Sequence, residues 1–243
     1  MAKANKSDSK DGILAEIKKD KVMKIGIEGA YPPFNYYDNQ NQLVGFDVDI
    51  ANEITKRMGI KPEYIAIPWD TIIGGLLTKK YNVIISSMAI TEERKQKVEF
   101  TDAYYRTGAQ LFVNKNNKDI RDPKTDMKNK KIGVAIGTIF EKKAVELGAN
   151  VINYKSDLLT FQDLANGRVE GVLSDRAVGA RMIKEKAYPF KPVGDLLMES
   201  IAGIAVNKQE DTLKNELNKH IKEMMDDGTY TKISEKWFGD DIR

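Results

Sequence analysis

The hydrophobic positions of the chain follow two spacings in turn, one typical of strands and one typical of helices. Residues 23–28 alternate as a strand does, and residues 36–44 carry an Asp/Asn-rich turn, which predicts a hairpin. Apolar residues then follow helical spacing through residues 47–58, before Gly59 ends the predicted helix. Further elements follow in the same order: a strand at 64–67, a helix at 69–77, a buried strand at 82–87 and a helix that opens at Thr91.

A second run of the same kind begins near Lys130. Its expected elements are strands at 131–136, 151–154 and 171–174 and helices at 140–147 and 158–166. Near the C-terminus, a single apolar stripe predicts a helix that ends at Asp227-Gly228; the stripe consists of Leu213, Leu217, Ile221 and Met224. Apolar strands that alternate with helices predict parallel sheets covered on both faces, so we expect an α/β fold.

Residues 114–130 separate the two runs and are charged and turn-rich, without a core pattern. Such a segment is typical of a domain boundary. We therefore expect two α/β lobes with a cleft between them. Ligands of open α/β sheets bind beyond the carboxyl ends of the strands, which places a candidate site in that cleft.

Composition narrows the chemistry that this site can perform. The chain has 243 residues, enough for two modest domains, with 41% hydrophobic and 31% charged residues. It has no Cys and one His, His220, which excludes disulfides, thiolate metal sites and Cys nucleophiles and argues against most zinc sites. The net charge of +3 is too small to indicate a nucleic-acid partner. We expect no metal and no cofactor.

No targeting or membrane segment is predicted. Residues 1–11 are polar and lack the apolar core of a signal peptide. The longest nearly apolar stretches, such as residues 133–140, are far shorter than the ~20 residues of a membrane helix. Residues 1–21 are expected to be a short tether or a cloning remnant.

Several side chains with binding chemistry come just after predicted strands, where they would meet at one edge. They are Glu28, Tyr31, Trp69, Ser86, Ser87, Arg94, Thr138 and Asp175. This set suits a small zwitterion, with Arg94 for a carboxylate and Asp175 for an ammonium group. The aromatic rings of Tyr31 and Trp69 are available to enclose the side chain of the ligand.

Each of these residues also has an ordinary structural role open to it. Arg94 could be a solvated helix residue, and Tyr31 and Trp69 could be core aromatics. Thr138 and Asp175 could cap helices, although capping and anion binding use the same free N–H groups at a helix start. The placement of all these residues after successive strands favours a binding site.

Several strings along the chain resemble those of family 3 solute-binding proteins, the polar amino-acid receptors of ABC importers. The strings are GIEGAYPPF at 26–34, GFDVDIA at 45–51, SSMAITEER at 86–94, VEFTDAYY at 98–105, IGV at 132–134 running to Gly137-Thr138, GRVEG at 167–171 running to Asp175, GTY at 228–230 and KWFG at 236–239. They occur in family order from about residue 22 to the end.

The resemblance implies a periplasmic-binding-protein fold, with two α/β lobes joined by a two-strand hinge near residues 108–111 and 198–203. Lobe 1 would comprise residues 22–108 and 203–243, and lobe 2 residues 109–202. The lobes would close like a flytrap on one free amino acid. The chain would act as a monomer outside the cytoplasm, free in the periplasm or lipid-anchored, with its leader absent from this chain. A membrane permease and an ATPase would be its partners.

Roles for the candidate residues follow from the same resemblance. Arg94 would hold the α-carboxylate together with Thr138. Asp175 would bind the α-ammonium group, helped by the Ser87 carbonyl. The ligand side chain would lie against the remaining residues, which are Glu28, Tyr31, Trp69 and Ser86.

Three positions depart from the family pattern. Ala89 stands where Ser or Thr is usual, which removes one hydrogen bond to the carboxylate, worth about 1 kcal/mol. Asn82 replaces a common Asp, a change that we expect to be structural, and Ile139 replaces a small hydroxyl residue. The effect of Ala89 on carboxylate binding is left open.

Glu28 is the best indication of the ligand. A carboxylate beside aromatic rings favours a cationic side chain such as that of arginine, lysine, ornithine or histidine. Similar acidic residues also occur in receptors for neutral ligands, so glutamine and cystine stay open as alternatives.

Two other functions share this fold. A cyclohexadienyl dehydratase needs a general acid in the cleft, and the run Asp175-Arg176-Ala177-Val178 lacks the second carboxylate expected there. A ligand-binding domain of a sensor is the other alternative. The end of the chain shortly after Trp237-Phe238-Gly239 favours a free-standing receptor. We therefore expect a binding protein and no catalytic residues.

Overall fold

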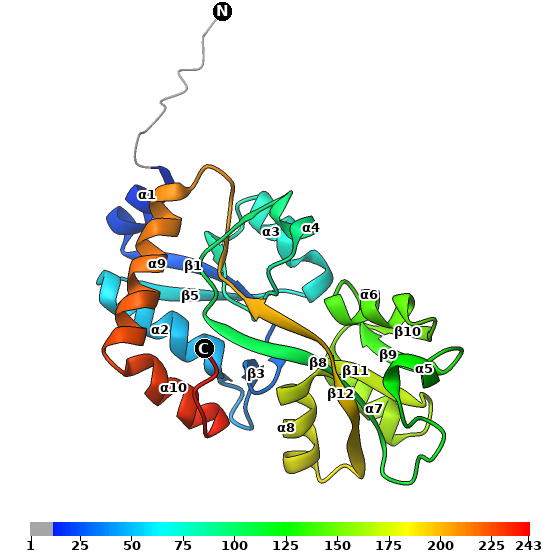
Figure 1. Ribbon diagram of the computed structural model, residues 1–243. Coiled ribbons are helices and arrows are strands. Elements are labelled where there is room, and N and C mark those ends of the chain that lie inside the picture. Colours follow the sequence, from blue (N-terminus) through cyan, green and yellow to red (C-terminus); the bar gives the residue numbers. More distant parts are fainter. Residues whose placement is uncertain (1–11) are drawn as a thin grey trace, which may run out of the picture.

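The computed structural model describes residues 12–243, which form two α/β lobes joined by two strands (Figure 1). Lobe 1 is built on a five-stranded sheet whose strands are, in spatial order, β5 (Lys61–Ala66), β1 (Val22–Ile27), β6 (Val83–Ile84), β13 (Ala205–Val206) and β7 (Glu99–Phe100). A small antiparallel sheet beside it consists of β2 (Ala30–Tyr31), β3 (Asn35–Tyr37) and β4 (Leu43–Val44). The β3–β4 pair confirms the predicted hairpin.

Lobe 2 is built on a second five-stranded sheet. Its strands are, in spatial order, β10 (Asn150–Tyr154), β9 (Lys131–Ala135), β11 (Gly171–Asp175), β8 (Tyr105–Asn114) and β12 (Phe190–Ala202). The first three strands are parallel, whereas β8 and β12 run antiparallel to their neighbours. In lobe 1, β13 is likewise antiparallel to both strands beside it. The prediction of parallel sheets was therefore wrong for β8, β12 and β13.

Helices accompany both sheets. Those of lobe 1 are α1 (Gly12–Asp20), α2 (Phe46–Met58), the 3-10 turn η1 (Trp69–Thr71), α3 (Ile72–Leu77), α4 (Glu92–Lys95), α9 (Asp211–Asp226) and α10 (Thr229–Phe238). Those of lobe 2 are α5 (Pro123–Asp126), α6 (Ile139–Glu146), α7 (Asp157–Ala165) and α8 (Arg176–Lys186). No helix within residues 12–243 is long and apolar enough to cross a membrane.

Strands β8 and β12 connect the lobes (Figure 1). They pair along most of their length, with an irregularity between Val193 and Met198. Both predicted hinge segments, 108–111 and 198–203, lie in these strands or directly after them. The residue boundaries given above for the two lobes stay a prediction.

The C-terminal helices return to lobe 1 and pack against elements from the start of the chain. All four residues of the predicted stripe on α9 are buried: Leu213, Leu217, Ile221 and Met224. Helix α9 contacts α1 and α2, and α10 contacts α2. This return explains why an amphipathic helix follows lobe 2 in the sequence.

Two expectations about the loops and termini were wrong. Residues 12–20 form helix α1 and are not a tether, because Ile17 is buried with Ile13 and Leu14 packed beside it, and Glu210 accepts a hydrogen bond from the Ile13 amide at 3.0 Å. Residues 1–11 lie outside the described part of the chain. The segment 114–130 has core contacts, because it buries Ile120 and Met127 and contains α5.

Candidate ligand-binding site

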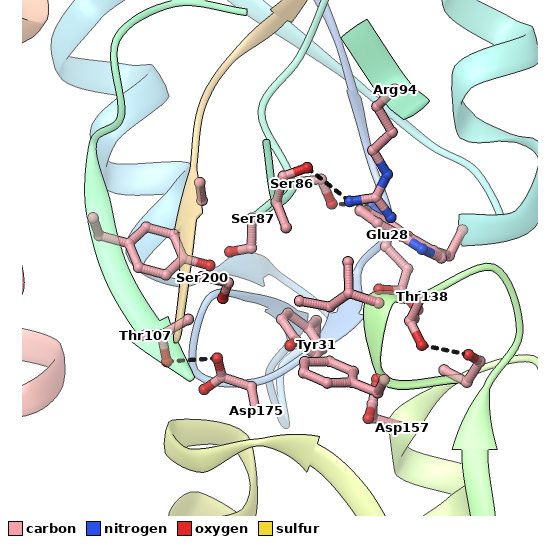
Figure 2. A pocket seen from close by; sticks show the side chains of 17 residues that line it. Glu28, Tyr31, Ser86, Ser87, Arg94, Thr107, Thr138, Asp157, Asp175 and Ser200 are labelled. Atoms are coloured by element: carbon pink, nitrogen blue, oxygen red, sulfur yellow. Dashed lines mark hydrogen bonds between the residues drawn. The ribbon is translucent and has the colours of Figure 1, made fainter. Parts of the chain in front are cut away.

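All eight candidate residues line one cavity between the lobes (Figure 2). The cavity has an empty volume of about 500 Å³, counting the part open to solvent, which lies within the usual range of small-molecule sites. Nine further residues complete its lining: Ala89, Tyr105, Thr107, Ala135, Ile139, Phe140, Asp157, Ser200 and Ala202. Lobe 1, lobe 2 and both hinge strands therefore contribute to the same site.

Arg94, in the short helix α4, is held by backbone carbonyls and by an aromatic ring. Its Nη1 donates to the Ala89 carbonyl at 2.8 Å, and its Nη2 donates across the cleft to the Gly137 carbonyl at 3.2 Å. The guanidinium carbon lies 5.4 Å from the centre of the Trp69 ring. Burial lowers the pKa of Arg94 to about 10, so the side chain stays positively charged at neutral pH. Within residues 12–243 no carboxylate forms an ion pair with Arg94, which leaves its charge available to a ligand.

Thr138 caps a helix and also lines the cavity. It is the N-cap of α6, where its hydroxyl accepts from the Glu141 amide at 3.2 Å and donates to the Ala135 carbonyl at 2.7 Å. The preceding residue, Gly137, has φ +78°, a conformation that side chains with a Cβ adopt only with strain. This turn at the end of β9 aims its carbonyl at Arg94 and at the Trp69 Nε1, which donates to it at 3.3 Å.

Asp175, at the end of β11, is buried and also caps a helix. Its Oδ1 accepts from the Ala177 amide at 2.7 Å, at the start of α8, and its Oδ2 accepts from the Thr107 hydroxyl at 2.6 Å (Figure 2). Burial raises the pKa of Asp175 to about 6, although these hydrogen bonds oppose the rise. At neutral pH the group is therefore a carboxylate in a cavity wall, suited to an ammonium ion.

Ser86 and Ser87 follow β6 and are fixed by a buried polar cluster. Ser86 Oγ accepts from the Glu28 amide at 3.0 Å. Ser87 has φ +55°, and its hydroxyl donates to Oδ2 of the buried Asp47 at 2.7 Å. Tyr104 links the same groups, because its hydroxyl accepts from the Ser87 amide at 3.1 Å and donates to Asp47 Oδ1 at 2.6 Å. These bonds stabilise the left-handed backbone that turns Ser87 into the cavity wall.

Glu28 follows β1 and is partly buried, and no hydrogen bond within residues 12–243 reaches its carboxylate. Burial and the nearby charge of Asp157 raise the pKa of Glu28 to about 8. Tyr31 is 9% exposed and belongs to the buried core, and Trp69 is partly exposed and packs against a second core cluster, so both rings line the cavity and contact the core.

The sequence analysis missed three polar residues of this cavity. Asp157 follows β10 at the same edge as the other residues, a signal that was available in the sequence. Thr107 and Ser200 lie within the hinge strands, where no strand end marks them. Asn82 has the structural role expected of it, since its Oδ1 accepts from the Lys24 amide at 2.7 Å.

Contacts across the cleft flank the cavity. On one side Arg181 of α8 donates to the Tyr36 hydroxyl at 3.1 Å, and on the other Lys142 of α6 forms an ion pair with Glu93 of α4. The lobes are thus closed on each other around the cavity. No cluster of three or more potential metal ligands is present among residues 12–243.

Comparison with known proteins agrees with this architecture. The family described as bacterial extracellular solute-binding proteins, family 3, matches residues 23–240. The L-cystine-binding protein TcyJ of Escherichia coli (strain K12) is 33% identical over 98% of this chain and 90% of its own length. An L-arginine-binding protein of Pseudomonas aeruginosa is 37% identical over 92% of this chain and 90% of its own.

A solved structure shows the same overall shape. It is an ancestral amino acid-binding protein, AncCDT-1, described as a precursor of cyclohexadienyl dehydratase. It superposes with a TM-score of 0.88 at 34% identity and covers 93% of this chain and 100% of its own.

Proposed function

The chain belongs to the bacterial extracellular solute-binding proteins of family 3, and we propose that it is the amino-acid receptor of an ABC importer, selective for a cationic amino acid. The ligand would be arginine, lysine, ornithine or histidine. The protein would act outside the cytoplasm and deliver its ligand to a membrane permease and ATPase. A lipid anchor and a monomeric state are part of the same proposal.

One observation carries the proposal: the ionisable groups that line the cavity do not form ion pairs with one another. Three carboxyl groups, of Glu28, Asp157 and Asp175, and one guanidinium, of Arg94, line it. Within residues 12–243 no salt bridge involves any of the four. A ligand with one carboxylate and two cationic groups complements this set, since Arg94 takes the carboxylate and Asp175 the α-ammonium group. Glu28 and Asp157 are then left for a cationic side chain.

The mechanism that we propose is closure by a population shift. The amino acid first binds to lobe 1 at Arg94, between Tyr31 and Trp69. Thr138 and Asp175 of lobe 2 then clamp its α-carboxylate and α-ammonium groups, which favours the closed arrangement. The permease would bind the closed form of the protein.

A thermal-shift screen of the twenty amino acids, with ornithine, citrulline and cystine added, tests this function. A ligand that binds only the folded protein stabilises it by about 2.7 kcal/mol at a concentration of 100 Kd, which raises the melting temperature. We expect shifts with cationic amino acids. Shifts with neutral amino acids alone, such as glutamine or cystine, would refute the cationic assignment and leave the receptor function standing.

A dehydratase is the second candidate, because a carboxyl group that keeps its proton near neutral pH can act as a general acid. Burial and the charge of Asp157 raise the pKa of Glu28 to about 8, which meets that requirement. Against it, the role proposed for Asp175 is to bind an ammonium group, which prephenate lacks. Turnover of prephenate or arogenate by the purified protein would favour the enzyme.

A further inference from the structure

Asp157 is a buried carboxylate of lobe 2 to which the sequence analysis assigned no role. It opens α7, is 2% exposed and lines the cavity. Its Oδ1 accepts a hydrogen bond from the buried Ser174 hydroxyl, and within residues 12–243 no side chain or backbone N–H of another residue donates to its Oδ2. A buried carboxylate without a cationic partner is costly, so a residue of this kind needs an explanation.

Asp157 and Glu28 line the same cavity from opposite lobes. Helix α7, which Asp157 opens, packs against β2, and β2 begins two residues after Glu28. Figure 2 shows Glu28 and Asp157 among the side chains around the cavity, with Tyr31 also at its wall. The charge of Asp157 contributes to the raised pKa of Glu28, after burial, so the two groups interact across the cleft. The other ionisable groups that line the cavity are Tyr31, Arg94, Tyr105 and Asp175.

We propose that Asp157 is the lobe 2 half of a carboxylate pair which, together with Glu28, selects ligands with a cationic side chain when the lobes close. The proposal rests on the receptor function proposed above and assigns a specificity-determining residue to it. Glu28 alone would contact the ligand as soon as lobe 1 binds it, whereas Asp157 arrives only on closure.

The physical basis is repulsion between like charges in a poorly solvated space. Closure brings two carboxylates into one cavity, and a cation between them offsets their repulsion. A neutral side chain does not, so the pair then closes only when one carboxylate takes up a proton. A neutral ligand should therefore bind more weakly than a cationic one of the same shape, and its complex should hold more protons than the complex with the cationic ligand.

A purely structural role for Asp157 makes a different prediction. A carboxylate in the first turn of a helix is favoured by the helix dipole, and its bond to Ser174 ties α7 to β11. Loss of such a role would lower the melting temperature but would weaken all ligands equally. The preference between matched ligands and the uptake of protons separate the two roles.

The test is isothermal titration calorimetry of the full chain with L-arginine and L-citrulline, whose uncharged urea group replaces the guanidinium with little change of shape. L-lysine and L-norleucine form a second pair. Each titration at pH 7.5 is run in two buffers with different ionisation enthalpies, which gives the number of protons taken up. The variants are Asp157→Asn, which keeps an acceptor for Ser174, and Glu28→Gln. Asp195→Asn, an exposed carboxylate of lobe 2, is the matched control.

For the unaltered protein we expect the complex with L-citrulline to hold more protons than the complex with L-arginine, by on the order of one per site. Asp157→Asn should reduce the preference for L-arginine by about tenfold or more and reduce this difference in bound protons. Asp195→Asn should leave both unchanged.

Three outcomes overturn the proposal in distinguishable ways. If Asp157→Asn keeps the full preference for the cationic ligand, Asp157 does not select charge, although the receptor function stands. If L-citrulline and L-arginine bind the unaltered protein with the same net change in bound protons, the carboxylate pair is refuted without any variant. If neither these ligands nor any other amino acid binds the unaltered protein, the receptor function itself is wrong.

Discussion

The Nη2 of Arg94 donates to the carbonyl oxygen of Gly137 at 3.2 Å, and this bond joins a side chain of lobe 1 to the backbone of lobe 2. Trp69 donates to the same carbonyl at 3.3 Å while its ring lies against the Arg94 guanidinium. Closure thus fixes the plane of the guanidinium at the edge of the cavity. A planar, fixed guanidinium is suited to bidentate binding of a carboxylate.

Arg94→Ala should abolish tight binding of amino acids while the fold stays intact, because Arg94 is the one cation among residues 12–243 that lines the cavity. Arg94→Lys should also bind poorly, with a loss of about 100-fold, since an ammonium group lacks the planar pair of donors. Calorimetry gives the affinity, and circular dichroism with the melting temperature checks the fold. Arg168→Ala, an exposed arginine of lobe 2, is the control. Near-normal affinity in Arg94→Ala would contradict the assignment.

Asp175→Asn should weaken binding by roughly 10- to 100-fold, because it removes a charge-assisted hydrogen bond to the α-ammonium group. The amide oxygen can still accept from the Ala177 amide, so the cap of α8 is kept, and the amide NH2 can donate to the Thr107 hydroxyl in place of the bond that Asp175 accepts from it. A ligand that lacks the α-ammonium group, such as a deaminated arginine, should bind both proteins equally weakly. An unchanged affinity for L-arginine would show that Asp175 is only a cap.

Tyr104→Phe should destabilise the fold by about 1–3 kcal/mol, because it leaves the Ser87 amide and the buried Asp47 each without one partner. Urea unfolding measures the change. Tyr37→Phe is the matched control, since Tyr37 is 47% exposed. We also expect weaker ligand binding in Tyr104→Phe, because Ser87 would no longer be held at φ +55°. Equal stability of the two variants would show that the cluster around Asp47 does not support the site.

The stability of the protein without added ligand should fall as the pH rises from about 5 to about 8. Burial raises the pKa of Glu28 to about 8, of Asp157 to about 7 and of Asp175 to about 6, each from an ordinary value near 4. In that pH range the folded, closed protein holds protons that the unfolded chain has released, so the free energy of unfolding decreases with pH.

Melting temperatures measured between pH 5 and pH 8 check this dependence. Hydrogen bonds lower the pKa of Asp227 and Asp241 to about 2. The lowered pKa values make the free energy of unfolding increase with pH, but these groups titrate below the range from pH 5 to pH 8. The decrease of the melting temperature with pH should be smaller in Glu28→Gln than in the unaltered protein. It should also be smaller when the unaltered protein is saturated with L-arginine. A melting temperature that rises with pH would contradict the raised pKa values.

Much of the site could be predicted because parallel strands bring their carboxyl ends to one edge. Glu28, Thr138 and Asp175 each follow such a strand, and local sequence is enough to find them. The fold class was predictable from the same alternation of strands and helices. The hinge was predicted from the family strings, and the strands β8 and β12 bear it out.

The parts that could not be predicted depend on contacts between distant segments. Thr107 enters the site only because β8 crosses from one lobe to the other and pairs with β11. Asp157 and Glu28 line one cavity only because the two lobes close on each other, which no local pattern encodes. Helix α1 was missed because its apolar face is short and is completed by packing against α9.

The most direct test of the central claim is calorimetric titration of the full chain with L-arginine and with L-glutamine at pH 7.5. We predict one ligand per chain for L-arginine, with an affinity at least about tenfold higher than for L-glutamine, because only the cation can lie between Glu28 and Asp157. Equal or tighter binding of L-glutamine, or no binding of either amino acid, would contradict the account.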